Sequence, residues 1–371
     1  MGTLEEILQR QDRWARGRGL SPNEQGLLPT VSENLFISLS AATIAELERG
    51  AGCELHDRSG EPAKMRAIHS SAALVCNVFE YWRQTDLAVI GQVLGIPDPL
   101  VSVHVEKPVH TGLRGTAPTL DLLLVGKEGF AWGVDSLFTE PYKSPAPTHT
   151  LTALYFPPKR KLWADLGLPC CQRLAEQIRD RHAAFKRVDA CQLLKHSLGL
   201  RRQYRHGQLL MLWYGLPTAE GDEIATEIAA FAEAVDPSLG FRAIEYNCLF
   251  TRLTEEPSAS PAYLAYLLSR YSYPPPAGTN DPPEPGIRTF AAWVPIEPSR
   301  RRRKTGPNYT GCLMTGKLRE AGIPEFLDGL AQMAANEVLA KMRSEKAGTE
   351  KPTARRRLSG TRKSGTSTEE A

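Results

Sequence analysis

Apolar residues near the start of the chain recur every three to four positions, which is the period of an amphipathic helix. Leu4, Ile7 and Leu8 predict a first helix, and the pattern resumes near residue 40 after a Gly-containing loop. A further helix is expected over residues 70–84, where Ser70 can cap the first turn. This part of the sequence predicts helices but contains no candidate catalytic motif.

The middle of the chain changes to strand-like patterns. Strands are expected at 100–105, 120–125 and 130–138, and the turn at 126–129 predicts that the last two form a hairpin. The later elements are expected to be helices at 170–187 and 189–201, a buried strand at 208–214, a helix at 220–235, a strand at 241–246 and a helix at 261–273. This order predicts an α/β protein with a mixed sheet covered by helices.

Composition divides the chain into five parts. Six prolines between residues 274 and 285 are typical of a stiff linker. The expected parts are an N-terminal helical segment (1–64), the main α/β domain (65–273), the linker (274–286), a small basic region (287–343) and a disordered basic tail (344–371). Within the basic region a strand is expected at 289–296 and a helix at 324–342, which either packs on the body or pairs with a second subunit in a homodimer.

The overall composition is that of a soluble globular protein, with 42% hydrophobic and 23% charged residues. No apolar stretch is long enough for a membrane span or a signal peptide, so a cytoplasmic location is expected. The seven cysteines are scattered and form no CxxC motif, which predicts reduced thiols and argues against a zinc knuckle.

Charge is distributed unevenly along the chain. Residues 300–371 hold 16 Lys and Arg against 8 Asp and Glu, a net charge of +8, whereas residues 1–299 carry −5. Either this basic end binds a polyanion such as DNA or it is a solvated tail. The candidate nucleic-acid-binding residues are Arg300, Arg301, Arg302, Arg303 and Lys304.

Two acids interrupt the apolar strands of the expected hairpin. Asp121 opens one strand in LDLLLV, and Asp135 lies near the end of its partner in WGVDSLF. A buried carboxylate is unfavourable unless it meets a metal, a cation or several donors. The pair therefore suggests a cation site, although both acids could also be solvated at strand ends.

Several stretches around these acids resemble the PD-(D/E)XK nuclease superfamily, and within it a group of bacterial restriction endonuclease-like proteins. They are VEKPVHTGLRGTAPTLDLLL, GVDSLFTEPY and VDACQLLKHSLGL, with HSSAALVCNVF before them and LLMLWYGL after them. The resemblance covers about residues 65–250. It implies a restriction-endonuclease-like core of order α-β-β-β-α-β, with a metal site on the central hairpin and a basic C-terminal extension.

The resemblance also implies roles for individual residues. Asp121 matches the first acid of the motif and Asp135 the second, and both would hold Mg²⁺ or Mn²⁺. Glu106 matches a further acid, and Gln192 and Lys195 match polar positions on the helix beside the site. The implied activity is metal-dependent hydrolysis of DNA by an endonuclease.

The chain departs from the motif at the lysine two residues after the second acid, where it has Leu137. That lysine would position the attacking water and offset developing charge. One reading is that Lys107 or Lys195 fills the same space. The other is that the protein kept a nuclease fold for binding and lost cleavage. A third hypothesis, that the acids merely cap strands in a partner-binding module, also stays open.

Three other residues have two readings each. His196 is expected either to touch a phosphate or to be a hydrogen-bonded packing residue. Glu80 either completes a metal shell or is a surface acid, and His69 either contributes to the site or belongs to the cap of the helix that follows it.

Overall fold

The computed structural model describes residues 2–50, 52–58, 60–143 and 151–273. The expected linker, basic region and tail lie outside these residues, as do the strand at 289–296, the helix at 324–342 and the basic cluster from Arg300 to Lys304. In the described part of the chain, no helix is both long enough and apolar enough to cross a membrane. The six described cysteines form no disulfide with one another.

A five-stranded mixed sheet, in the order β1-β2-β3-β4-β5, forms the centre of the protein. The first three strands are antiparallel neighbours, and β4 and β5 continue the sheet in parallel to β3. The strands are β1 Leu100–Pro108, β2 Thr119–Gly126, β3 Ala131–Leu137, β4 Gly207–Trp213 and β5 Arg242–Glu245. The predicted α/β class with a mixed sheet is therefore confirmed.

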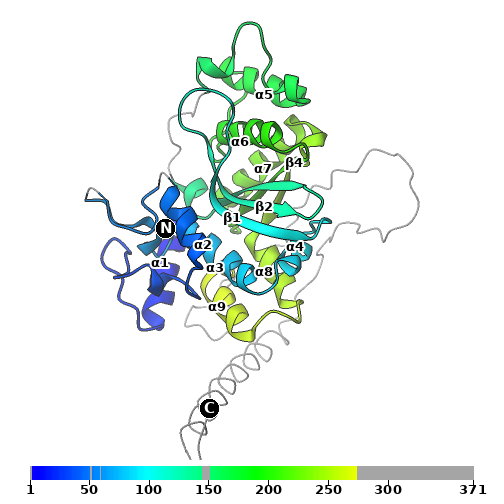
Figure 1. Ribbon diagram of the computed structural model, residues 1–371. Helices are drawn as coiled ribbons and strands as arrows, with labels where there is room; N and C mark the ends of the chain where they lie inside the picture. The colour runs from blue at the N-terminus through cyan, green and yellow to red at the C-terminus, as the bar shows by residue number, and fades with distance from the viewer. Residues whose placement is uncertain (1, 51, 59, 144–150, 274–371) are drawn as a thin grey trace, which may run out of the picture.

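Helices cover both faces of the sheet (Figure 1). In that view α5, α6 and α7 lie above the sheet, whereas α2, α3, α4, α8 and α9 lie below it. The helices are α1 Thr3–Gly17, α2 Ala41–Arg49, α3 Ser71–Gln84, α4 Leu87–Val93, α5 Pro169–Arg179, α6 Ala190–Gln203, α7 Ala219–Ala234, α8 Tyr246–Thr254 and α9 Pro261–Tyr271.

Local signals set the starts of the two helices that flank the candidate site. The side chain of Ser70 accepts a hydrogen bond from the backbone N–H of Ala73 and so caps α3. Asp189 does the same for α6 through the N–H of Gln192. Both helix starts agree with the sequence prediction.

The prediction was wrong at three helices. The helix expected over 170–187 ends at Arg179, because Arg181 adopts a left-handed backbone conformation with φ 61°. The short helix α4 was not predicted. Helix α8 was missed because it follows β5 without a loop, so its first apolar residues read as a continuation of the strand.

A buried arginine of α9, Arg270, contacts several residues of the N-terminal segment, and its exposed fraction is 0%. Its guanidinium donates to the carbonyl of Asn34 at 3.0 Å, the carbonyl of Ile68 at 2.9 Å and the side chain of Gln11 at 3.2 Å. It also lies over the ring of Trp14, 4.3 Å from the centroid. No carboxylate is among these contacts, so carbonyl dipoles and aromatic faces stabilise the charge.

Candidate functional site

The sheet register brings the two predicted acids of the hairpin together. Leu122 pairs with Val134, so one further step along the antiparallel ladder sets Asp121 opposite Asp135. A carboxylate oxygen of Asp121 accepts the backbone N–H of Ser136 at 2.5 Å, which places this carboxylate against the end of β3. The side chains of the two acids thus begin at adjacent points of neighbouring strands.

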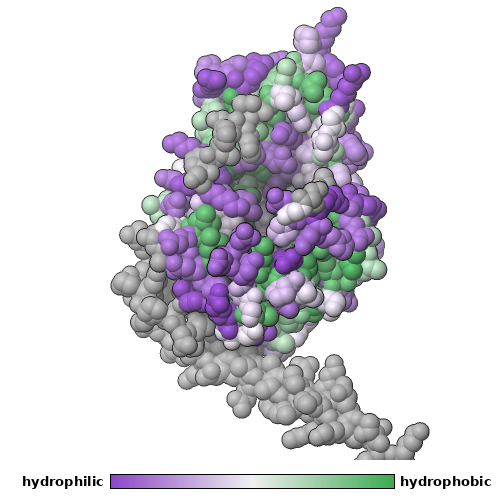
Figure 2. Space-filling view, turned by 90° about the vertical axis from the view of Figure 1, so that its left-hand side faces the viewer, coloured by the Kyte–Doolittle hydropathy of each residue, from purple (hydrophilic) through white to green (hydrophobic). Residues whose placement is uncertain are grey.

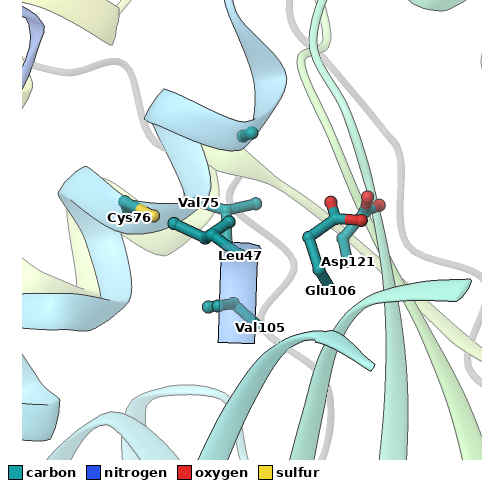
Figure 3. A pocket seen from close by; sticks show the side chains of 7 residues that line it. Leu47, Val75, Cys76, Val105, Glu106 and Asp121 are labelled. Atoms are coloured by element: carbon teal, nitrogen blue, oxygen red, sulfur yellow. The ribbon is translucent and has the colours of Figure 1, made fainter. Parts of the chain in front are cut away.

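Glu106 is the third member of this group. It lies between Val105 and Lys107 on β1, whose pairing across β2 sets Glu106 opposite Asp121. Its φ of 46° is unfavourable for a residue with a side chain, and such strain is concentrated at functional sites. Figure 3 shows the carboxylates of Glu106 and Asp121 pointing toward one another beside a cavity. We refer to Glu106, Asp121 and Asp135 as the acid cluster.

The cavity at Glu106 and Asp121 is small and largely apolar. Its volume is about 10 Å³, just enough for one water molecule or a small ion. The rest of its wall comes from α2, α3 and β1, through Leu47, Ala72, Val75, Cys76 and Val105. Because this wall offers no hydrogen bonds from its side chains apart from a thiol, the two carboxylates are the main polar groups that face the cavity.

Burial and mutual repulsion disfavour the charged form of Asp121. Burial raises the pKa of Asp121 well above its ordinary value, and the charges of Asp135, Glu106 and Glu140 raise it further. The hydrogen bond from the Ser136 N–H opposes the shift. Asp121 is therefore held where an additional positive charge would be strongly favourable.

Burial also disfavours the charged form of Glu106, but a nearby lysine partly offsets this effect. Burial raises the pKa of Glu106 to about 7, and the neighbouring charge of Glu54 adds to the shift. Lys64 lowers this pKa, and its ammonium also pairs with Glu54 at 3.0 Å. Sequence reasoning missed Lys64, Glu54 and Glu140, because all three lie outside the strands and the motif lysine slot that directed the search.

Asp135 is held from the other face of the sheet. Its carboxylate meets Nδ1 of His196 on α6 at 2.7 Å, and Nε2 of His196 meets the side-chain nitrogen of Gln192 at 2.9 Å. With Gln192 donating, Nε2 accepts, so the ring proton is on Nδ1 and is donated to Asp135. His196 is 1% exposed and is thus the hydrogen-bonded residue that one sequence reading expected.

The acids are adjacent but not all gathered around one point. Asp121 faces the cavity below the sheet, whereas Asp135 is bound by α6, which lies above it. Within the described ranges, no three His, Cys, Asp or Glu side chains lie close enough together to hold a metal ion as placed. The oxygen donors of Glu106 and Asp121 are nevertheless of the type that Mg²⁺ and Mn²⁺ prefer.

The proposed substitutes for the motif lysine are not engaged with the acids. Leu137 is half-buried at the end of β3, and Lys107 and Lys195 form no ion pair with any described residue. Lys107 directly follows Glu106 on β1, while Lys195 lies on α6 near Cys191, whose pKa its charge lowers. Unlike Lys107 and Lys195, Lys64 interacts with the acid cluster, because its charge lowers the pKa of Glu106.

The side chains of Glu80 and His69 both lie near the start of a helix. Glu80 is 3% exposed rather than at the surface, and its oxygens accept from the N–H of Ser40 and the hydroxyl of Thr43 at the start of α2. Ser70, not His69, caps α3. Burial lowers the pKa of His69, and its Nδ1 has no hydrogen-bond partner among the described residues.

We expect His196 to orient Asp135 for cation binding. Asparagine at 196 can present an N–H where Nδ1 lies, whereas leucine cannot. His196→Leu should therefore weaken Mn²⁺ binding by about 10- to 100-fold, the usual effect of losing such a supporting hydrogen bond, and His196→Asn should keep most of the affinity. Isothermal titration with Mn²⁺ measures this. Equal affinity of both variants and the unaltered protein would show that His196 is a packing residue only.

Comparison of the chain with protein-family models, with curated proteins and with solved structures found no match.

Proposed function

We propose that this protein is a Mg²⁺-dependent endonuclease that hydrolyses DNA phosphodiester bonds on a restriction-endonuclease-like core. The element order supports this proposal. Helix α3, the antiparallel strands β1, β2 and β3, helix α6 and the parallel strand β4 follow the α-β-β-β-α-β order of that core, with α4 before β1 and α5 before α6 as additional helices. The proposed activity comes from the resemblance of the sequence motifs, and Asp121 and Asp135 lie on the hairpin where that core would hold its metal.

One observation carries the proposal, namely that Glu106 and Asp121 face a single ion-sized cavity with raised pKa values. Keeping carboxylates close together in a buried site is unfavourable, and a divalent cation would remove the penalty. Oxygen ligands suit Mg²⁺ or Mn²⁺. Asp121 and Glu106 would hold the ion directly, whereas Asp135, which His196 binds on the other face of the sheet, would contribute the attraction of its negative charge.

The chain's own groups would perform the remaining tasks. When bound, the ion would polarise a phosphodiester and acidify a water molecule. The Ser136 N–H keeps the Asp121 carboxylate at the end of β3, and His196 orients Asp135. Lys64, held by Glu54 near Glu106, is the ammonium best placed to offset negative charge, alongside the sequence candidates Lys107 and Lys195.

A plasmid-nicking assay tests the proposal. The full chain is incubated with supercoiled plasmid and Mg²⁺ or Mn²⁺, beside Asp121→Ala purified in the same way. Metal-dependent nicking that falls at least about 100-fold in the variant is expected, because the ion would lose a central ligand. Residual activity that is equal in both proteins would reveal a contaminating nuclease and reject the assignment.

A second candidate, a nuclease-fold DNA-binding protein without turnover, is favoured by Leu137. This apolar side chain occupies the place where the motif has its lysine. Leu137→Lys restores the motif, and its half-buried position at the strand end lets an ammonium reach solvent. If the protein is an active enzyme, we expect nicking to rise by about 10-fold or more, as for a restored electrostatic group. Activity only in Leu137→Lys would instead show that the unaltered protein has no turnover, as this second candidate requires.

A further inference from the structure

Two segments of the described chain contain no acidic residue. Residues 107–120 and 190–219 include no Asp or Glu, although residues 1–299 as a whole carry a net charge of −5. Their basic residues are Lys107, Arg114, Lys195, Arg201, Arg202 and Arg205. Positive charge is therefore concentrated in two places well separated along the sequence.

The fold brings these segments together. The first ends β1 and forms the loop to β2, and the second contains α6 and β4. A side chain added at Gly199 of α6 would meet the carbonyl of Val109 at 2.8 Å, so the loop lies directly on this helix. Further along the loop, a Cβ at Gly112 would lie 2.4 Å from the guanidinium carbon of Arg202. In Figure 1 the loop rises from the sheet beside α6.

The basic side chains at this junction are accessible. Arg114, Arg202 and Arg205 are exposed, and Arg201 and Lys107 are half-buried. None of these five residues forms an ion pair with a described residue. Figure 2 views the molecule from the left of Figure 1 and shows a largely hydrophilic face that is hollowed near its middle.

The acid cluster borders both segments. Glu106 and Asp121 are the residues immediately before and after the first segment, and Asp135 is bound by His196 of the second. The second segment is also bordered by Asp189 and Glu220. A polyanion that follows the basic residues of the first segment would therefore come next to Glu106 and Asp121. Such an arrangement attracts a phosphate backbone and brings it to a cation site.

We propose that Lys107, Arg114, Lys195, Arg201, Arg202 and Arg205 form a basic surface that binds the phosphodiester backbone of a nucleic acid. The inference deepens the proposed function by naming where the substrate lies, and it differs from the basic cluster at Arg300 to Lys304. Phosphate contacts of this kind fix the position of a nucleic acid without reading its sequence.

The test is a salt titration of binding by the full chain to a fluorescent 24-base-pair DNA duplex, followed by anisotropy in EDTA so that no cleavage occurs. The variant is Arg114→Ser with Arg202→Ser. Its matched control is Arg173→Ser with Lys186→Ser, two exposed bases outside the basic surface. The variant should bind about 10-fold or more weakly near 0.1 M salt, with a log–log salt slope smaller by about 2, and the control should match the unaltered protein.

Equal losses in the variant and the control, or no loss in either, would overturn the basic surface and leave the C-terminal cluster or no site as the source of binding. The result is independent of catalysis. Binding through the basic surface without metal-dependent nicking would reject the endonuclease and keep the surface. Nicking by a variant that binds DNA as the unaltered protein does would keep the endonuclease and reject the surface.

Discussion

Replacing Arg270 by methionine is expected to lower the free energy of unfolding by about 4 kcal/mol, the range for losing a buried, fully bonded charged group. Methionine fills much of the volume but leaves the carbonyl of Ile68 and the side-chain oxygens of Gln11 and Asn34 without the guanidinium as donor. It also removes the cation over the ring of Trp14. These contacts connect the first 68 residues to α9, so both parts should loosen together.

Urea unfolding followed by tryptophan fluorescence measures this loss. Arg49→Met is a suitable control, because Arg49 is exposed and an exposed substitution should change stability by no more than about 0.5 kcal/mol. Arg270→Lys is informative as well. Lysine keeps the charge but cannot reach the separate acceptors at once, so it should recover only part of the loss. Stability of Arg270→Met within the range of the control would contradict the account of this network.

Glu106→Gln should stabilise the protein at neutral and higher pH while removing its response to divalent cations. The pKa of Glu106 is about 7 in the folded state against an ordinary 4.5, so folding takes up a proton between these values. The free energy of unfolding therefore falls as pH rises from 4.5 to 7 and stays low above 7. Glutamine removes the charge, so the variant should gain on the order of 2 kcal/mol at pH 8 and nothing below pH 4.5, allowing for partial exposure.

Glu245→Gln provides a matched control. Burial also raises the pKa of Glu245 to about 7, and this residue ends β5 outside the acid cluster. Both variants should therefore show the same gain at pH 8. Only Glu106→Gln should lose the rise in melting temperature that Mn²⁺ causes, because a ligand that binds the folded state stabilises it by mass action. Loss of the Mn²⁺ response in both variants, or in neither, would remove Glu106 from the proposed ion site.

Much of the architecture could be predicted without coordinates. The short apolar runs of the hairpin strands, the turn at Gly126 to Gly129 and the caps at Ser70 and Asp189 are signals carried by a few neighbouring residues. Such signals depend little on the tertiary structure, so they can be read from the sequence. The prediction failed for the two shorter helices, because α4 has only seven residues, too few for a clear apolar pattern, and α8 follows β5 without a loop.

The candidate site was predicted less completely. Asp121 and Asp135 stood out because acids are unusual in apolar strands, and both lie one residue beyond the last register pair, Leu122 with Val134. The sequence did not predict that the carboxylate of Asp121 faces the cavity while that of Asp135 bonds to His196. Strand pairing follows from local pattern, but the direction of a side chain at a strand end depends on which helix packs against it.

The sequence by itself determined the α/β class, the order of the central elements and the positions of Glu106, Asp121 and Asp135. Only the tertiary structure decided that Lys64 and Glu54 lie near Glu106, that His196 holds Asp135, and that Arg202 lies on the loop at Gly112. The physical reason is the distance along the sequence over which each interaction acts. Hydrophobic period and capping act over a few residues, whereas charges and hydrogen bonds act through space between segments that only the folded chain brings together.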